Sequence, residues 1–224
     1  MEPALKTTRR TVVIGTGALA LAGVAALAGL SIAGLERPAL AQNPPLGELM
    51  KPGPLGDMIL GDEKAPVTII EYASMTCPHC AHFSTTTMPE LKKRYIDTGK
   101  VRYTLREFPL DALAAAGFML GRCAGNDKYM PIMETLFAKQ SDWIVKEPIP
   151  PLKSIAKQFG FTEEQFNQCL ANQKVLDDVQ AVRDYAVEKL GVNSTPTFFI
   201  NGKRLVGDQS IDALQKEIDP YLKE

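Results

Sequence analysis

The sequence has no excess of charge of either sign. Its 224 residues include 25 Lys and Arg against 26 Asp and Glu, a formal net charge of -1. A surface that binds nucleic acid needs a clear excess of basic residues, so nothing in the charge indicates such a partner. Internal repeats are also lacking, and 45% of the residues are hydrophobic. This balance is typical of one globular domain, or of one domain with an insertion.

Cysteine is scarce. The chain has Cys77, Cys80, Cys123 and Cys169. The first two form a C-x-x-C pair, whereas the last two are 46 positions apart, so the second short-spaced pair of a structural zinc site is missing. His79 or His82 would be able to add a nitrogen ligand, and a metal-binding or chaperone-like module stays open as an alternative. Haem attachment is excluded, because Ala81 stands where C-x-x-C-H requires histidine.

The first 41 residues have the pattern of an export signal. Lys6, Arg9 and Arg10 precede an uncharged run of 24 residues over 12–35, and Ala39-Leu40-Ala41 offers a cleavage site. The arginine pair is a partial match to a twin-arginine signal, and export by the general secretory route is an equal alternative. An uncleaved membrane anchor is the alternative, because 24 apolar residues are long enough to span a bilayer. In either case we expect the bulk of the protein outside the cytoplasm.

A β-prone run leads into the C-x-x-C pair. Val67, Ile69, Ile70 and Tyr72 form a nearly continuous β-prone run, which favours a central strand, and a helix is expected to begin at Cys77. The unpaired N–H groups and the dipole of the first helical turn favour a thiolate there. Protonated His79 would add a second cationic neighbour. We therefore expect Cys77 to be mostly ionised and to be the attacking cysteine, more exposed than Cys80.

Glu71 interrupts this apolar strand six residues before Cys77. A buried carboxylate with a raised pKa would take or give the proton of Cys80 during thiol exchange. The alternative is a Glu71 side chain that faces the surface or forms a salt bridge with Arg106 or Lys100.

Two motifs together resemble the DsbA family of thioredoxin-fold proteins from bacterial envelopes. These are Cys77-Pro78-His79-Cys80 after a strand that carries Glu71, and Thr195-Pro196-Thr197 far downstream. The resemblance covers roughly residue 61 to the C-terminus. It implies an α/β thioredoxin fold with an inserted all-helical domain, and a periplasmic location. It also implies a cis bond before Pro196, in a loop where Thr195 hydrogen-bonds an extended substrate beside Cys77.

The periodicity of the chain agrees with this order of elements. We expect a helix over 77–95, a strand over 100–108, helices over 112–124, 128–139, 151–159, 163–171 and 174–190, hairpin strands over 197–200 and 203–206, and a helix over 210–222. The corresponding division is a signal (1–41), an arm that is either a tether or a sheet-edge segment (42–66), a first thioredoxin part (67–109), the helical insert (110–191) and a second thioredoxin part (192–224). Aromatic residues expected in the core of the insert are Trp143, Phe118, Tyr129, Phe137, Phe159 and Phe161.

In an oxidising compartment, Cys123 and Cys169 are expected to form a structural disulfide. Closing a loop of this length contributes about 4 kcal/mol in the chain-entropy model. A second redox pair and two free buried thiols are the alternatives.

The family resemblance implies a disulfide oxidase that acts on reduced exported proteins through Cys77 and Cys80. Its chemistry needs no diffusible cofactor and no metal, and a DsbB-like, quinone-linked membrane enzyme would reoxidise it. We expect a monomer. Thr195 departs from the Val that oxidases often carry before the cis-proline and is common among isomerases, so an isomerase or reductase is the alternative.

Overall fold

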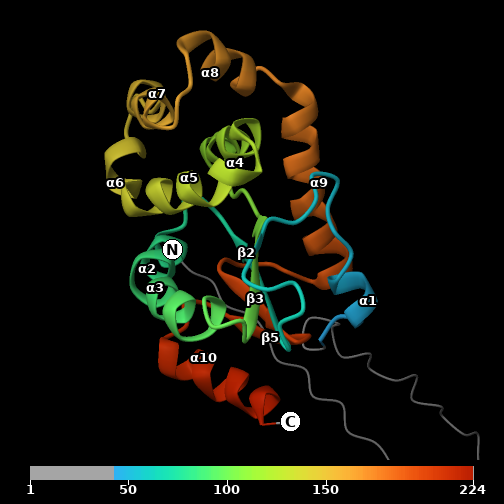
Figure 1. Ribbon diagram of the computed structural model, residues 1–224. Coiled ribbons are helices and arrows are strands. Elements are labelled where there is room, and N and C mark those ends of the chain that lie inside the picture. Colours follow the sequence, from blue (N-terminus) through green and yellow to red (C-terminus); the bar gives the residue numbers. More distant parts are fainter. Residues whose placement is uncertain (1–42, 224) are drawn as a thin grey trace, which may run out of the picture. The chain divides into compact units, whose positions relative to one another are not determined.

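The computed structural model describes residues 43–223, and this part of the chain contains one mixed five-stranded sheet (Figure 1). The strands are β1 (Ile59–Leu60), β2 (Val67–Ala73), β3 (Val101–Glu107), β4 (Thr197–Ile200) and β5 (Lys203–Val206), in the spatial order β1-β3-β2-β4-β5. Strands β2 and β3 are parallel, and the other neighbours are antiparallel. The expected export signal lies outside the described residues.

The helices between β3 and β4 follow the predicted pattern closely. They are α4 (Ala112–Ala124), α5 (Asn126–Ala138), α6 (Gln140–Trp143), α7 (Ile149–Gln158), α8 (Glu163–Leu170) and α9 (Gln173–Leu190). The short helix α6 was not predicted, because four residues are too few to show a helical period. Thr162 and Gln165 form a capping box at the start of α8, and Gly191 ends α9 in a left-handed conformation with φ 65°.

The long helix expected after the C-x-x-C pair is present, but its hydrogen-bond pattern changes along its length. Helix α2 (Pro78–His82) continues as a π-type stretch (Phe83–Thr87), α3 (Met88–Leu91) and a second π-type stretch (Lys92–Ile96). Pro89 lacks an N–H group and its ring crowds the preceding turn, so the wider π register before it relieves the conflict.

The C-terminal part of the fold is a hairpin followed by a helix. Asn201 and Gly202 both have positive φ, 45° and 92°, as the two-residue turn between β4 and β5 requires. Helix α10 (Ile211–Ile218) begins after Ser210, whose side chain caps it, and continues as a 3₁₀ turn (Asp219–Leu222). Both elements were predicted from the sequence.

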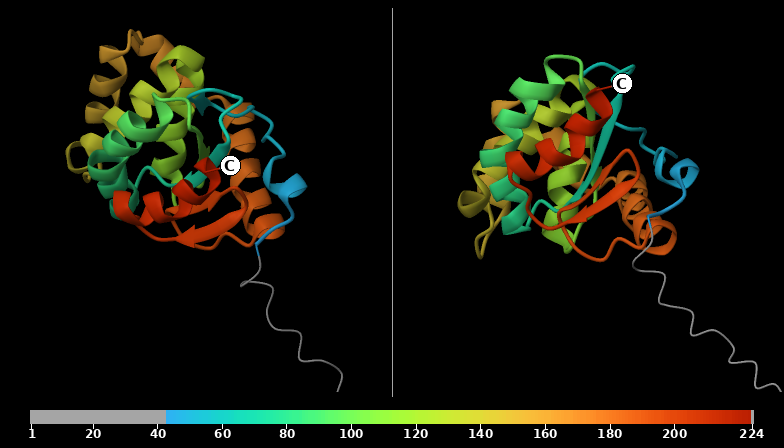
Figure 2. Two further views of the ribbon diagram at one scale, coloured as in Figure 1. Left: turned by 60° about the horizontal axis from the view of Figure 1, so that its bottom comes forward. Right: turned by 90° about the horizontal axis from the view of Figure 1, so that it is seen from below.

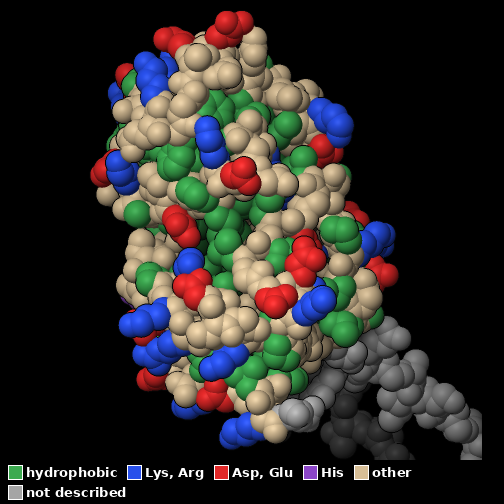
Figure 3. All heavy atoms as spheres, in the orientation of Figure 1, with side chains coloured by type: hydrophobic (Ala, Val, Ile, Leu, Met, Phe, Trp, Pro, Cys, Tyr) green, Lys and Arg blue, Asp and Glu red, His purple; other side chains and the backbone are tan. Residues whose placement is uncertain are grey.

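The sheet is covered on both faces (Figure 2). One face packs against α2, α3 and α10, and the other against α9 and the arm that precedes β2. Four of the six aromatic residues expected in the core of the insert, Trp143, Phe118, Tyr129 and Phe137, are buried, and the other two are partly buried. On the face seen in Figure 3, apolar side chains gather in a hollow between the inserted helices and the lower part of the molecule.

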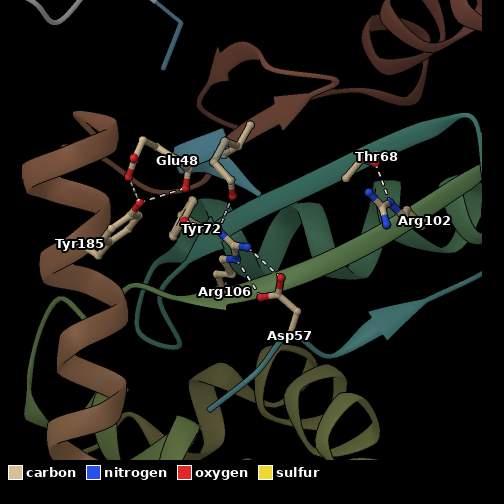
Figure 4. A network of polar contacts seen from close by, with 8 residues as sticks. Glu48, Asp57, Thr68, Tyr72, Arg102, Arg106 and Tyr185 are labelled. Atoms are coloured by element: carbon tan, nitrogen blue, oxygen red, sulfur yellow. Dashed lines mark hydrogen bonds and ion pairs between the residues drawn. The ribbon is translucent and has the colours of Figure 1, made fainter. Parts of the chain in front are cut away.

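The arm before β2 is bound to the sheet, so its interpretation as a tether is wrong. It contains α1 (Leu46–Leu49) and β1, which pairs with the outer edge of β3. The buried guanidinium of Arg106 donates two hydrogen bonds to Asp57, at 2.8 and 2.9 Å, and one each to the Leu49 carbonyl and the Tyr72 hydroxyl (Figure 4). These bonds join three segments of the chain through one side chain that is shielded from water.

Candidate active site

Cys77 lies at the junction between strand β2 and the helix that follows it. The backbone turns over Ser74 to Cys77, where the Cys77 N–H donates to the Ser74 carbonyl at 3.1 Å. Cys77 is the N-cap of α2, and Pro78 occupies the first helical position, where no N–H is needed. Both cysteines of the motif are free thiols; Cys77 is 6% exposed and Cys80 1%. As predicted, Cys77 is the more accessible of the two.

The surroundings of Cys77 favour its thiolate. A hydrogen bond from the Cys80 side chain is the main cause that lowers the Cys77 pKa, to about 5, and the Thr195 side chain and the N–H groups of Cys80 and His79 contribute. Burial acts in the opposite direction. His79 is exposed, and it acts on Cys77 through its backbone N–H, whereas the sequence had suggested its imidazole.

Cys80 has the opposite character. Burial is the largest cause that raises the pKa of the Cys80 thiol, and the hydrogen bond to Cys77 and the charge of Glu71 raise it further. These opposite shifts in pKa favour ionisation of Cys77, with Cys80 as the thiol that donates to it.

The Thr195–Pro196 peptide bond is cis and faces the redox pair. The Thr195 carbonyl oxygen is 3.3 Å from the Cys77 Sγ atom, although 118 positions separate the two residues. The Gly207 N–H donates to the Pro196 carbonyl at 2.8 Å, which connects this loop to the residue after β5. The two motifs that carried the family resemblance are thus adjacent in space.

Glu71 lies inside the protein, 2% exposed, and accepts a hydrogen bond from the Tyr103 hydroxyl. Burial is the dominant cause that raises the Glu71 pKa to about 8; the Tyr103 bond lowers it, and negative charge on Cys77 and Asp208 raises it. The alternative of a surface or salt-bridged Glu71 is wrong, because Arg106 pairs with Asp57 instead.

Sequence reasoning missed several polar contacts around the site. His82 is exposed, and its Nδ1 atom contacts the Asp208 carboxylate across 126 positions. In the sequence, Tyr103 stood out only as one of the alternating apolar residues of its strand. Gln140 contacts the backbone of Cys77, and no sequence pattern indicated this contact. Each contact depends on how distant segments pack, which a local pattern does not report.

The other two cysteines lie apart from this site in the sequence and in the fold. Cys123 of α4 and Cys169 of α8 form a disulfide, with a Cα–Cα distance of 6.0 Å. They are therefore not a pair of free thiols in this structure.

Within residues 43–223, no group of three or more His, Cys, Asp or Glu side chains is placed to hold a metal ion. In the same range, none of the helices combines the length and the apolar character needed to cross a bilayer.

Comparison with known proteins gives consistent matches. A thioredoxin family model matches residues 55–220. A Rickettsia conorii protein named as a protein-disulfide oxidoreductase is 35% identical over 170 residues, 75% of this chain and 61% of the relative, so the chain spans about three fifths of that protein's length. A Bacillus anthracis protein named as disulfide bond formation protein D is 30% identical, with 73% of this chain and 77% of the relative covered.

A solved structure supports the same assignment. The crystal structure of Wolbachia pipientis α-DsbA1 matches with a TM-score of 0.73 and 33% identity, and the match covers 80% of this chain and 97% of that one. The expected fold, a thioredoxin fold with an all-helical insertion, is thereby confirmed. The chain belongs to the thioredoxin family and, within it, to the DsbA-like proteins.

Proposed function

We propose that this protein is a thiol-disulfide oxidase that introduces disulfide bonds into exported proteins. The observation that carries the proposal is the Cys77 thiol, held at a helix N-terminus with its pKa lowered to about 5 and placed beside the cis-proline loop. A stabilised thiolate lowers the free energy of the reduced form, which makes the disulfide form a stronger oxidant. This relation is known from DsbA itself and is applied here to a member of its family.

In the proposed reaction, a substrate thiolate attacks the Cys77 sulfur of the oxidised pair. The Cys77–Cys80 bond breaks as a mixed disulfide forms, and Cys80 leaves. A second substrate thiolate then attacks the substrate sulfur of the mixed disulfide, and Cys77 leaves as a thiolate. Two electrons pass from two substrate thiols to the cysteine pair, and the substrate gains one disulfide.

Glu71 is proposed as the proton donor to Cys80 in the first step. Cys80 has a raised pKa and so leaves most easily when it is protonated. Glu71, with a pKa of about 8, carries a proton at neutral pH inside the protein, and the two groups interact electrostatically. In the reverse direction, Glu71 would accept the same proton.

The substrates are proposed to be reduced, incompletely folded exported polypeptides that reach the cysteine pair over exposed apolar side chains. Leu110 at the start of the insert is 54% exposed, and Ile144, Val145 and Ile149 beside α6 are also exposed. Thr195 would bind the extended substrate through its backbone.

We propose that the protein works as a monomer in the periplasm after Sec or Tat export, and that a DsbB-like membrane enzyme reoxidises it. The insert would comprise residues 110–191.

The second candidate is a disulfide isomerase or reductase of the same fold, favoured by Thr195 before the cis-proline. The reduction potential separates the two candidates. The protein from residue 42 onward is equilibrated with graded glutathione buffers, and each cysteine is quantified by alkylation. An oxidase requires a potential well above about -180 mV, that of protein disulfide isomerase, whereas a value near about -270 mV, that of thioredoxin, would contradict the proposal.

A further inference from the structure

One side chain of the insert holds the backbone of the turn that carries Cys77. The Gln140 Nε2 group donates to the Met75 carbonyl at 2.9 Å and to the Cys77 carbonyl at 3.0 Å. Both partners are acceptors, so the amide must present its NH₂ group to them. One amide thus binds the turn on both sides of Thr76.

The Met75 and Cys77 carbonyl groups both require hydrogen-bond donors. Met75 is fully buried, and a buried carbonyl without a hydrogen bond destabilises the fold. The Cys77 carbonyl also accepts the first helical hydrogen bond, from the Ala81 N–H at 3.1 Å. Gln140 therefore binds the same peptide group that starts the helix beneath the reactive sulfur.

Gln140 is itself held in place by its helix. It is the first residue of α6, and Trp143, at the other end of this short helix, is fully buried and donates from Nε1 to the Leu136 carbonyl at 2.8 Å. Because its helix is anchored, the Gln140 side chain loses little conformational entropy when it forms its two hydrogen bonds to the turn.

Two contacts with α4 hold the same turn from another direction. The Thr76 hydroxyl donates to the Asp111 carboxylate at 2.7 Å, and the Met75 side chain packs so closely on Gly117 that a Cβ atom there would be 3.0 Å from the Met75 Cγ. The turn is therefore fixed by the insert at three consecutive residues, and Gln140 is the contact that reaches Cys77 itself.

We infer that Gln140 is a positioning residue for thiol-disulfide exchange, which holds the Cys77 backbone so that its sulfur faces the N–H groups of α2 and the Thr195 loop. The inference deepens the proposed function and rests on it. The amide also directs the positive ends of two N–H dipoles at the turn, which favours a thiolate nearby. The insert thereby helps to position the reactive cysteine of the thioredoxin part, in addition to contacting the substrate.

The test compares Gln140→Met, which keeps the length but removes the donors, with Gln140→Glu, which also places a negative charge against two carbonyls. Gln168→Met is the matched control, because Gln168 donates only to Glu164 on the exposed surface of α8. The Cys77 thiolate is titrated by its ultraviolet absorbance, and the equilibrium with glutathione is measured. Loss of such bonds changes an equilibrium constant about three- to tenfold. In Gln140→Met, the acid dissociation constant of Cys77 and the equilibrium constant that favours the reduced form should both fall by that factor, and in Gln140→Glu both should fall by more.

The control should leave both values within about twofold of the unchanged protein, by the same reasoning about an exposed bond. A purely structural Gln140 would destabilise the oxidised and reduced proteins equally and leave the Cys77 pKa and the glutathione equilibrium unchanged, which would overturn the inference. The unchanged protein is measured alongside. If it proves to be a poor oxidant, the proposed function fails, while the Cys77 titration in the variants still decides the role of Gln140.

Discussion

The Tyr103 hydroxyl donates a hydrogen bond to the Glu71 carboxylate, and both side chains are buried beside the cysteine pair. Strand β3 therefore supplies the polar partner of the one acidic residue in β2. The bond lowers the Glu71 pKa against the larger effect of burial, which leaves a value of about 8. Glu71 thus titrates near neutral pH.

The Glu71→Gln variant should alter how stability depends on pH. The Glu71 pKa rises from 4.5 to about 8 on folding, so its contribution to stability is fully present below pH 4.5 and is lost as pH rises through 8. The unchanged protein should lose on the order of 2–4 kcal/mol from this group over that range, and the variant should not. Urea unfolding of the oxidised forms, in which Cys77 does not titrate, measures the difference. Parallel stability curves would disprove a raised pKa.

Replacing Tyr103 by Phe should raise the Glu71 pKa beyond its present value. The substitution keeps the ring and removes the hydrogen bond that stabilises the carboxylate. The carboxyl stretching band in difference infrared spectra reports the protonated fraction as a function of pH. Tyr95→Phe is a suitable control, because the Tyr95 hydroxyl bonds Asp219 and not Glu71. A midpoint that stays near 8 in Tyr103→Phe would mean that the bond does not affect this carboxylate.

The reduced protein should gain stability relative to the oxidised protein as pH rises. The Cys77 pKa is depressed on folding, from 9.0 to about 5, so the contribution is fully present above the unfolded value and is lost as pH falls towards 5. Allowing for the partial access of water to this sulfur, we expect on the order of 2–4 kcal/mol between pH 5 and pH 9. Unfolding both forms at several pH values gives this difference, and an oxidised form that gains as much as the reduced one would argue against a Cys77 thiolate.

Substitutions of the two cysteines of the motif should impair thiol-disulfide exchange in different ways. Cys77→Ala should abolish exchange, since the attacking sulfur is gone. In Cys80→Ala, the Cys77 thiolate attacks a disulfide of the substrate and releases one substrate thiolate; the mixed disulfide should then accumulate, because no Cys80 thiol is left to attack it. Non-reducing gels of each variant with a substrate that carries a disulfide show the trapped species. Comparable activity in the two variants would contradict the assigned order of attack.

Removing the disulfide of the insert should cost stability without removing exchange. The bond closes a loop of 46 residues, and the chain-entropy model gives about 4 kcal/mol for its loss in a Cys123→Ala, Cys169→Ala variant. Unfolding in urea measures the cost, and alkylation confirms that Cys77 and Cys80 still cycle. A stability within about 1 kcal/mol of the unchanged protein would show that the crosslink hardly constrains the unfolded chain.

Local patterns were sufficient for most elements of the fold. The strand before the C-x-x-C pair, the hairpin at Asn201-Gly202 and the capping box at Thr162 each depend on neighbouring residues, and each is present. The exception in the insert is α6, whose four residues carry no period. The π-type stretches around Pro89 also show no distinct pattern of apolar residues.

The polar contacts of the site could not be predicted, because they depend on the register of distant segments. Tyr103 reaches Glu71 because β2 and β3 are parallel with Ile69 opposite Tyr103, and a shift of one residue would turn its side chain to the other face. Gln140 reaches the Cys77 backbone across 63 positions. Only the family resemblance brought Thr195 and Cys77 together before the structure was known.

The arrangement of the outer strands limits how readily an unfolded chain can pair with the edges of this sheet. The edge of β3 is partly covered by the two residues of β1, and β5, on the opposite side, is four residues long and carries Lys203 in an ion pair with Glu217. Short, charged or covered borders give a foreign polypeptide few free amide groups on which to form a new strand. Under the proposed function, an unfolded substrate would therefore be held at the Thr195 loop and the apolar side chains near Cys77, and not along the edges of the sheet.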